Sequence, residues 1–214
     1  MRISITILAS IGASLAFATS YFAPLSYGNA SQAKTDFESL TTEDAFLRAL
    51  TLAGAPGGIV RKTSCGGAPD QRQSFPSPLS LRSTLEVIRK TDPQYRLQNE
   101  KGVTNLIPRG GEPELLKVRI KEFRAQRVLT ANLALEKLLA LSEVRKRSAR
   151  LRLNEGLRME GLSSPPSTSI PRTLHYKNIT LRSVLNEIAR TYGSAVWQYS
   201  EFHCEGKNQF SIAF

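Results

Sequence analysis

A thirteen-residue segment occurs twice, one hundred residues apart, and this repeat constrains the fold more than any other feature of the chain. Residues 79–91 and 179–191 share Leu, Arg, Ser, Leu, Ile and Thr in strict register. The identical pairs are Leu81/Leu181, Arg82/Arg182, Ser83/Ser183, Leu85/Leu185, Ile88/Ile188 and Thr91/Thr191. Because identities in fixed register at such a distance are typical of a duplicated structural unit, we expect a fold with two related halves.

Each copy of the repeat has the pattern of an amphipathic helix. In the first copy Leu81, Leu85 and Ile88 stand at i, i+4 and i+7, so their side chains form one apolar stripe. Ser80 and its counterpart Thr180 stand where a helix N-cap accepts from the free backbone N–H groups of the first turn. The repeat therefore predicts two equivalent helices that bury matching faces.

The residues after each copy indicate a helix end followed by a hairpin. Pro93 disfavours helical geometry in the residue before it, and Gly193 is the residue type that most readily ends a helix in the left-handed conformation. Beyond these positions, short apolar runs flank turn-rich segments. We predict strands at 95–98 and 103–107 after the first copy, and at 195–199 and 209–214 after the second.

Further elements precede the repeat helix in each half. The first half is predicted to contain a helix at 43–53 and strands at 59–65 and 72–75, and the second a strand at 115–123, a helix at 132–152 and a strand at 173–176. A connection rich in Gly, Ser and Pro spans 155–171. The sequence thus predicts an α+β fold of two related small modules, 43–108 and 109–214, each with two helices packed on short strands and hairpins.

The first thirty-three residues have the pattern of a signal peptide. Arg2 precedes an apolar run from Ile3 to Phe22, and the small residues that follow fit cleavage after Ala30 or Ala33. An uncleaved anchor is the alternative, because about twenty apolar residues can span a bilayer. We expect an exported protein, periplasmic or secreted, that is anchored at its N-terminus if the signal stays uncleaved. Residues 34–42 are polar and are predicted to be a flexible lead-in.

The chain is basic, with 29 Lys and Arg against 18 Asp and Glu and a formal net charge of +11. In a cytosolic protein such a charge would point to nucleic acid. In an exported protein it favours anionic lipid, cell-wall polymer or an acidic partner protein. A solvated basic face without a partner is the alternative. We do not expect a nucleic-acid partner.

The densest group of cations lies at the end of the helix predicted at 132–152. It consists of Arg145, Lys146, Arg147, Arg150 and Arg152. These side chains are a candidate contact for phosphate or carboxylate groups of an anionic partner. The alternative is that they stabilise the negative, C-terminal end of the helix dipole. More cations on the preceding strand and at its exit would extend a basic face, namely Arg119, Lys121, Arg124 and Arg127.

Only two cysteines occur, Cys65 and Cys204. Neither lies in a C-x-x-C or metal-type spacing, and an exported protein reaches oxidising surroundings in which disulfides persist. A bond between them would close a loop of about 140 residues and stabilise the fold by about 4–5 kcal/mol in the chain-entropy model. We predict this disulfide, and two buried thiols are the alternative.

No motif for catalysis, a cofactor or a metal stands out in the sequence. His203 adjoins Cys204, but neighbouring residues of a strand point to opposite faces, which is poor geometry for a Cys–His pair. The other histidine is His175, so a zinc ligand set lacks members. We expect no catalytic, cofactor-binding or metal-binding residues. A hydrolase of unknown type is a further alternative, and it would need a pocket of convergent titratable groups.

Two pairs of residues invite a functional interpretation that we do not favour. Arg82 and Arg182 recur at the same position of the repeat, and we expect both to be solvated residues of a first helical turn. Trp197 and Tyr199 lie two apart on one predicted strand. We expect these rings in the core or in an interface, where large aromatic side chains contribute most, and not as a platform for ligand stacking.

A strand that leads into a helix of the form Ser/Thr-Leu-x-x-x-Leu-x-x-Ile resembles the short domain at the N-termini of secretins and TonB-dependent receptors, the STN domain. The matching residues are Leu81, Leu85 and Ile88 after Phe75, and Leu181, Leu185 and Ile188 after Leu174 to Tyr176. The stretch from Glu43 to Val60 is similar to the family's first helix and the strand after it. The resemblance implies a bacterial, extracytoplasmic α/β fold that works through protein contacts and not through catalysis.

The sequence and this resemblance together lead to one functional expectation. We expect STN-like modules in duplicate, without a downstream pore or barrel. The expected role is that of a non-enzymatic, exported protein-interaction or scaffolding component of the bacterial cell envelope, with an envelope protein as its partner. Attachment to anionic lipid or cell-wall polymer through the basic helix is the first alternative.

Overall fold

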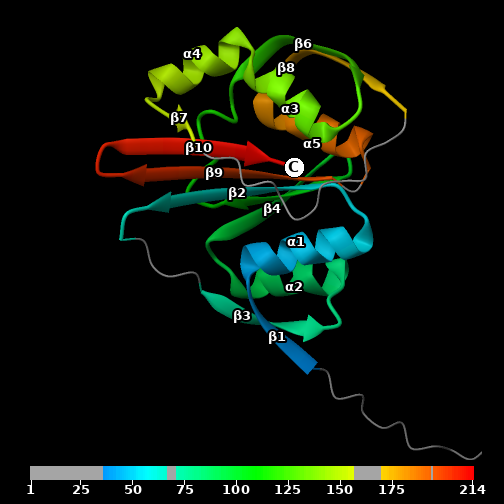
Figure 1. The fold of residues 1–214 in the computed structure, drawn as a ribbon. Helices are drawn as coiled ribbons and strands as arrows, with labels where there is room; N and C mark the ends of the chain where they lie inside the picture. The colour runs from blue at the N-terminus through cyan, green and yellow to red at the C-terminus, as the bar shows by residue number, and fades with distance from the viewer. Residues whose placement is uncertain (1–35, 67–70, 157–169, 194) are drawn as a thin grey trace, which may run out of the picture. The chain divides into compact units, whose positions relative to one another are not determined.

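A computed structural model describes residues 36–66, 71–156, 170–193 and 195–214, all within a compact unit that runs from Thr35 to Phe214 (Figure 1). The expected signal segment and most of the connection predicted at 155–171 lie outside the described residues. Among the helices of the described part, none is long and apolar enough to cross a membrane.

The described residues form five helices and ten strands, which confirms the α+β class. The helices are α1 (Thr42–Ala53), α2 (Leu81–Thr91), α3 (Ala131–Leu139), α4 (Ser142–Arg150) and α5 (Leu181–Thr191). The strands of the first half are β1 (Asp36–Thr41), β2 (Gly57–Ser64), β3 (Arg72–Ser77), β4 (Tyr95–Glu100) and β5 (Val103–Pro108). Those of the second half are β6 (Arg119–Val128), β7 (Asn154–Glu155), β8 (Arg172–Thr180), β9 (Val196–Cys204) and β10 (Lys207–Ala213).

A six-stranded sheet with the order β4-β5-β2-β9-β10-β7 forms the middle of the fold. The hairpins β4–β5 and β9–β10 are antiparallel, whereas β2 runs parallel to β5 on one side and to β9 on the other. The β2–β9 pair is long and runs from Gly57 opposite Val196 to Ser64 opposite His203. The two halves of the chain therefore share one sheet, and β2 and β9 form the junction between them.

Two antiparallel ribbons complete the strand pairing, β1 with β3 and β6 with β8. The pairings recur at matching places along the chain. Each half has one ribbon and one hairpin, and the second strand of the hairpin pairs with a parallel strand, β5 with β2 and β10 with β7. In Figure 1, α1 and α2 lie between the six-stranded sheet and the β1–β3 ribbon, while α3 and α5 lie between the sheet and the β6–β8 ribbon.

Neighbouring residues of the central strands point into two different cores, because side chains alternate between the faces of a sheet. Ile59 belongs to the cluster formed with α1 and α2, and the next residue, Val60, belongs to the cluster formed with α3 and α5. Val196 and Trp197 divide in the same way. The sheet is therefore buried on both faces, and Trp197 and Tyr199 are core residues with no exposed surface, as predicted.

The repeat segments form equivalent helices, as predicted. Ser80 Oγ accepts from the backbone N–H of Ser83, and Thr180 Oγ1 accepts from that of Ser183, each at 3.2 Å. The helix α2 ends at Thr91 before Asp92, and α5 ends at Thr191, two residues before Gly193 with its left-handed φ of +79°. The predicted hairpins follow both helices. The strands β4, β9 and β10 extend further toward the turns than expected, whereas β5 begins at Val103 as predicted.

Residues 36–41, expected within a flexible lead-in, form β1 instead. The segment pairs along its whole length with β3, from Asp36 opposite Ser77 to Thr41 opposite Arg72. Thr41 also caps α1, since its side chain accepts from the backbone N–H of Asp44 at 3.1 Å. The polar composition is compatible with a strand here, because a two-stranded ribbon with one solvated face needs few apolar residues.

The strand predicted at 115–123 is shifted along the chain to 119–128. Leu115 and Leu116 are both fully buried, which neighbouring residues of a half-exposed strand cannot be, and they lie in turns after Pro113. The carbonyls of Leu116 and Val118 accept from the first backbone N–H groups of α5. This loop therefore provides partners for donors that a helix start leaves free.

The single helix predicted at 132–152 is wrong, because the chain breaks it into α3 and α4. Leu141 between them has extended geometry, with ψ at 140°. The break lets both helices bury apolar residues in the same core, Leu135, Leu138 and Leu139 from α3 and Val144 from α4. The cations of the second part thereby sit on a short helix of their own.

Candidate functional site

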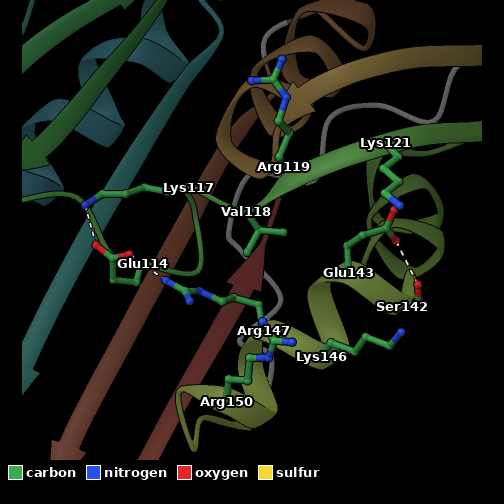
Figure 2. Close-up of a pocket in the computed structure, with 10 residues that line it drawn as sticks. All are labelled: Glu114, Lys117, Val118, Arg119, Lys121, Ser142, Glu143, Lys146, Arg147 and Arg150. Atoms are coloured by element: carbon green, nitrogen blue, oxygen red, sulfur yellow. Dashed lines mark hydrogen bonds and ion pairs between the residues drawn. The ribbon is translucent and has the colours of Figure 1, made fainter.

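The candidate site is a basic groove of about 700 Å³, which we call the α4–β6 groove (Figure 2). Three stretches of chain line it, namely the loop before β6, the first part of β6, and α4. The lining residues are Glu114, Lys117, Val118, Arg119, Lys121, Ser142, Glu143, Lys146, Arg147 and Arg150. Six of these side chains are cationic and two are anionic, so the lining carries a net charge of six minus two, or +4.

At one end of the groove, an ion-pair bridge centred on Glu114 joins two of the stretches that line it. The carboxylate oxygens of Glu114 lie 2.6 Å from Lys117 Nζ and 2.8 Å from Arg147 Nη2, so one carboxylate joins the loop to α4. The hydrogen bond from Lys117, together with the charges of both cations, holds the pKa of Glu114 below its usual range. Glu114 is therefore ionised at neutral pH, and it forms ion pairs with two of the six cations of the groove.

A second carboxylate, Glu143, lies in the first turn of α4. Ser142 Oγ donates to Glu143 Oε2 at 3.2 Å, and Figure 2 draws Lys121 beside the same carboxylate. A hydrogen bond from its own backbone N–H, with smaller contributions from Ser142 and Lys121, lowers the pKa of Glu143. Both carboxylates of the groove are thus anions that the surrounding donors stabilise.

The remaining cations have no carboxylate partner among the described residues. Arg119 comes from β6, while Lys146 and Arg150 come from α4. The latter two are one helical turn apart and exposed. Concave surfaces lined by one sign of charge raise the local concentration of counter-ions, so these cations favour the approach of anionic groups.

The basic cluster predicted from the sequence is only partly gathered at the groove. Lys146, Arg147 and Arg150 line it. Arg145 lines a smaller hollow of about 150 Å³ beside Glu136, and Arg152 follows the end of α4 with a left-handed φ of +55°. The five cations thus lie around the helix and not on one face.

The predicted extension of the basic face is also divided. Arg119 and Lys121 line the groove, but Arg124 forms an ion pair with Glu122 at 2.8 Å on the β6–β8 ribbon, and Arg127 does not line the groove. The sequence prediction does not include Lys117 or Glu114 in the basic site, because Lys117 falls within the strand predicted at 115–123 and Glu114 directly precedes it. Pro113, which begins the turn, was the available signal.

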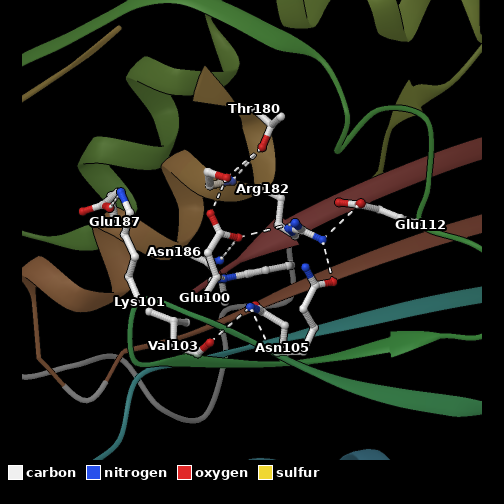
Figure 3. A network of polar contacts seen from close by, with 12 residues as sticks. Glu100, Lys101, Val103, Asn105, Glu112, Thr180, Arg182, Asn186 and Glu187 are labelled. Atoms are coloured by element: carbon white, nitrogen blue, oxygen red, sulfur yellow. Dashed lines mark hydrogen bonds and ion pairs between the residues drawn. The ribbon is translucent and has the colours of Figure 1, made fainter. Parts of the chain in front are cut away.

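A partly buried polar network joins the β4–β5 hairpin to α5, and it corrects the interpretation of Arg182 as solvated (Figure 3). The Arg182 side chain is 13% exposed and lies 3.1 Å from Glu112 and 3.4 Å from Glu100. Its counterpart Arg82 is 93% exposed and lies 3.5 Å from Glu86. Burial raises the pKa of Glu112, and Arg182 opposes that rise. Identical residues of the repeat therefore have different environments.

Glu100 is the acceptor at the centre of this network. Its two oxygens accept from Ser183 Oγ at 2.6 Å and from Asn186 Nδ2 at 3.0 Å. The amide oxygen of Asn186 in turn accepts from the indole N–H of Trp197 at 2.8 Å. Since Glu100 belongs to the first half and its donors to the second, the network fixes the hairpin of one half on the helix of the other.

Cys65 and Cys204 lie at disulfide-bonding distance, with Cα atoms 4.9 Å apart. Cys65 directly follows β2 and Cys204 is the last residue of β9, and the backbone N–H of Cys65 donates to the carbonyl of His203 at 3.1 Å. The ring of His203 is engaged elsewhere, 2.6 Å from Glu201 and 3.0 Å from Asn208. The predicted cysteine pair thus lies at the junction of the two halves.

Comparison with protein-family models, with curated proteins and with solved structures finds no match to this chain. Within the described residues there is also no group of three or more His, Cys, Asp or Glu that could hold a metal ion.

Proposed function

We propose that this chain is a non-enzymatic, exported protein of the bacterial cell envelope that acts by binding, and that the α4–β6 groove contacts anionic groups of an envelope partner. The observation that carries the proposal is the excess of six cations over two carboxylates around one concavity. Arg147 presents a planar fork suited to carboxylate and phosphate, and Lys146 adds a compact point charge. The groove is thus equipped to hold anions.

Binding is favoured over catalysis by the state of the two carboxylates. A general acid must hold its proton near neutral pH, which requires a raised pKa. The pKa values of Glu114 and Glu143 are both lowered by hydrogen bonds and nearby cations. Neither residue is poised to act as a general acid, so the groove suits retention of an anionic group better than acid-assisted hydrolysis.

We also propose that the two halves are related modules of the STN type, the first beginning at β1 and the second after β5. The support is the repeat itself together with the recurring pairings, in which ribbon, hairpin and parallel strand come in the same order twice. Such modules would act through protein contacts, and the shared sheet would make them one rigid scaffold.

Export rests on the signal pattern of residues 1–33. If the signal is cleaved as proposed, the mature protein begins at Ser31 or Lys34. Intact-mass measurement of the protein from the envelope fraction tests this directly. A mass that includes residues 1–30 in a protein that stays soluble would contradict both the cleavage and the anchored alternative.

The groove proposal is tested with the exported protein and a labelled polyanion over a salt series. The Lys146→Gln/Arg150→Gln variant removes two free cations of the groove, and Lys137→Gln/Arg145→Gln makes the same charge change away from it. We expect binding that weakens from low to physiological salt, because salt screens exposed charges beyond about 8–10 Å. Equal losses in both variants would mean that only net charge matters, and the groove would not be the site.

Anionic lipid or cell-wall polymer is the second candidate partner. The observation that favours it is the continuation of exposed cations onto the β6–β8 ribbon, where Arg124 and Lys177 flank Glu122, each with 60% of its side chain exposed. Pelleting with phosphatidylglycerol vesicles that is lost as salt rises, and that Arg124→Gln/Lys177→Gln reduces, would support it. Pelleting that persists in this variant would remove the ribbon as the contact.

A further inference from the structure

The groove already holds a carboxylate on a peptide chain, and this observation indicates the class of its ligand. Glu114 projects from the loop before β6, not from α4, and its oxygens lie within 2.8 Å of cations on both sides. Its side chain is 51% exposed, so the bridged end of the groove is open to solvent. The chain itself thus shows how Lys117 and Arg147 receive a glutamate.

Further cations continue from this bridged end along two walls. Arg119 belongs to β6 and Lys146 and Arg150 belong to α4, and none of these three has a carboxylate partner among the described residues; Lys121 of β6 lies beside Glu143 (Figure 2). Successive side chains of an extended peptide point to opposite sides. A peptide that lies along the groove would therefore direct alternate side chains to the strand and to the helix, so that carboxylates on it reach both walls.

We infer that the α4–β6 groove binds an extended acidic segment, rich in Glu or Asp, of a partner protein. The inference rests on the proposed function and names the partner's chemistry. A concave site favours a narrow peptide chain over a lipid bilayer. The flat surface of a bilayer would contact only the rim of the groove, whereas a peptide can reach the cations on its floor. Glu114 then has a second role as an internal competitor, since it occupies Lys117 and Arg147 and adds one negative charge to the path of the ligand.

This role of Glu114 leads to a variant that should bind more tightly. Glu114→Gln keeps the size of the side chain but releases both cations and removes the repulsion. Because exposed ion pairs each contribute modestly, we expect the affinity for an acidic peptide to rise about threefold to tenfold. Lys146→Gln/Arg150→Gln should lower it by about tenfold, and the control Lys137→Gln/Arg145→Gln should change it by less than about twofold.

The experiment is fluorescence anisotropy with a labelled octaglutamate peptide and the purified exported protein. Polyphosphate and phosphatidylglycerol vesicles serve as competitors. Thermal unfolding of each variant is the control for folding, because every substituted side chain is on the surface. The inference is supported if octaglutamate binds, the groove variant loses binding and Glu114→Gln gains it.

The failures of the two proposals can be distinguished. If the groove variant loses octaglutamate but Glu114→Gln binds no better than the parent, the competitor role is wrong and the groove remains an anion site. If polyphosphate or vesicles displace the peptide at much lower charge concentration, the acidic-segment inference is overturned in favour of phosphate. If no probe depends on Lys146 and Arg150, the proposed function fails as well.

Discussion

Replacement of Gly58 by alanine should destabilise the protein through one steric conflict at the junction of its halves. Gly58 lies on β2 opposite Trp197 of β9 and Asn105 of β5. A Cβ atom at this position would lie 2.2 Å from Trp197 Cε2, 2.3 Å from Cζ2 and 2.4 Å from Asn105 Oδ1. The indole is fully buried and its N–H is bonded to Asn186, so it has little freedom to move away.

The magnitude follows from the number of close contacts. Overpacking of a well-packed core costs about 1–3 kcal/mol, and three contacts below 2.5 Å place Gly58→Ala near the upper end, at about 3 kcal/mol. For a unit of this size the loss corresponds to a fall in melting temperature of about 6–12 °C. Gly110→Ala is the matched control, because its Cβ meets no atom within 4 Å and its φ is not in the left-handed region.

The assay is urea unfolding followed by tryptophan fluorescence. Trp197 is the single tryptophan of the chain, so the signal reports the substituted site itself. Both substitutions lower the entropy of the unfolded chain alike, and their difference therefore isolates the steric conflict. A free energy of unfolding for Gly58→Ala within about 0.5 kcal/mol of that for Gly110→Ala would refute the packing of the indole over β2.

Three further outcomes are expected. Cys65→Ser should lower the free energy of unfolding by up to about 4–5 kcal/mol under non-reducing conditions, and a reductant that leaves the parent's urea midpoint unchanged would argue against the disulfide. Glu100→Ala should cost about 1–3 kcal/mol, because it leaves the partly buried Ser183 and the buried Asn186 without their acceptor. Glu86→Ala beside the exposed Arg82 should cost about 0.5 kcal/mol or less, and equal urea midpoints of the two variants would contradict the network. Burial, and then the hydrogen bond to Glu201, raises the pKa of Tyr199 above 10. Above that pH the unfolded chain releases a proton that the folded chain keeps, so stability should fall as pH rises, and Tyr199→Phe should reduce this slope by about 1.4 kcal/mol per pH unit in paired urea titrations.

Local signals in the sequence were sufficient for the repeat helices and their hairpins. Ser80 and Thr180 cap their helices as expected. In the stripe of the first copy, Ile88 is buried and Leu81 and Leu85 are half-buried. These features depend on residues that are neighbours in the chain. They could therefore be predicted without knowledge of the sheet.

The environment of the two repeat arginines could not be predicted in this way. Arg82 and Arg182 have the same position in the same motif, but only the second meets a hairpin from the other half of the chain. The carboxylates that pair with Arg182 are those of Glu100 and Glu112, which lie 82 and 70 residues away in the chain. Sequence pattern identified the arginine, and long-range packing determined what surrounds it.

The groove was predictable in its charge but not in its composition. The cations of α4 formed a visible cluster in the sequence, yet a helix distributes five neighbouring residues around its axis, and only Lys146, Arg147 and Arg150 reach the groove. Glu114 and Lys117 reach the groove from a turn, whereas the sequence predicts a strand from 115 onward. The one carboxylate that indicates the ligand's chemistry was therefore invisible before the fold was known.

The position of β2 in the middle of the sheet has a consequence for how the chain acquires its structure. Its longest pairing is with β9, and the partners are about 140 residues apart, so the central strand has its second neighbour only once nearly the whole chain is present. Pairing over such distances is slow, because the chain loses the entropy of closing a long loop before the stabilising contacts between the strands form. Until then Gly57–Ser64 is an unpaired edge, which other chains can pair with. A first half made alone, ending after β5, would keep that edge permanently and should aggregate. Truncation at the apparent repeat boundary would therefore remove β9, the strand that covers the edge of β2.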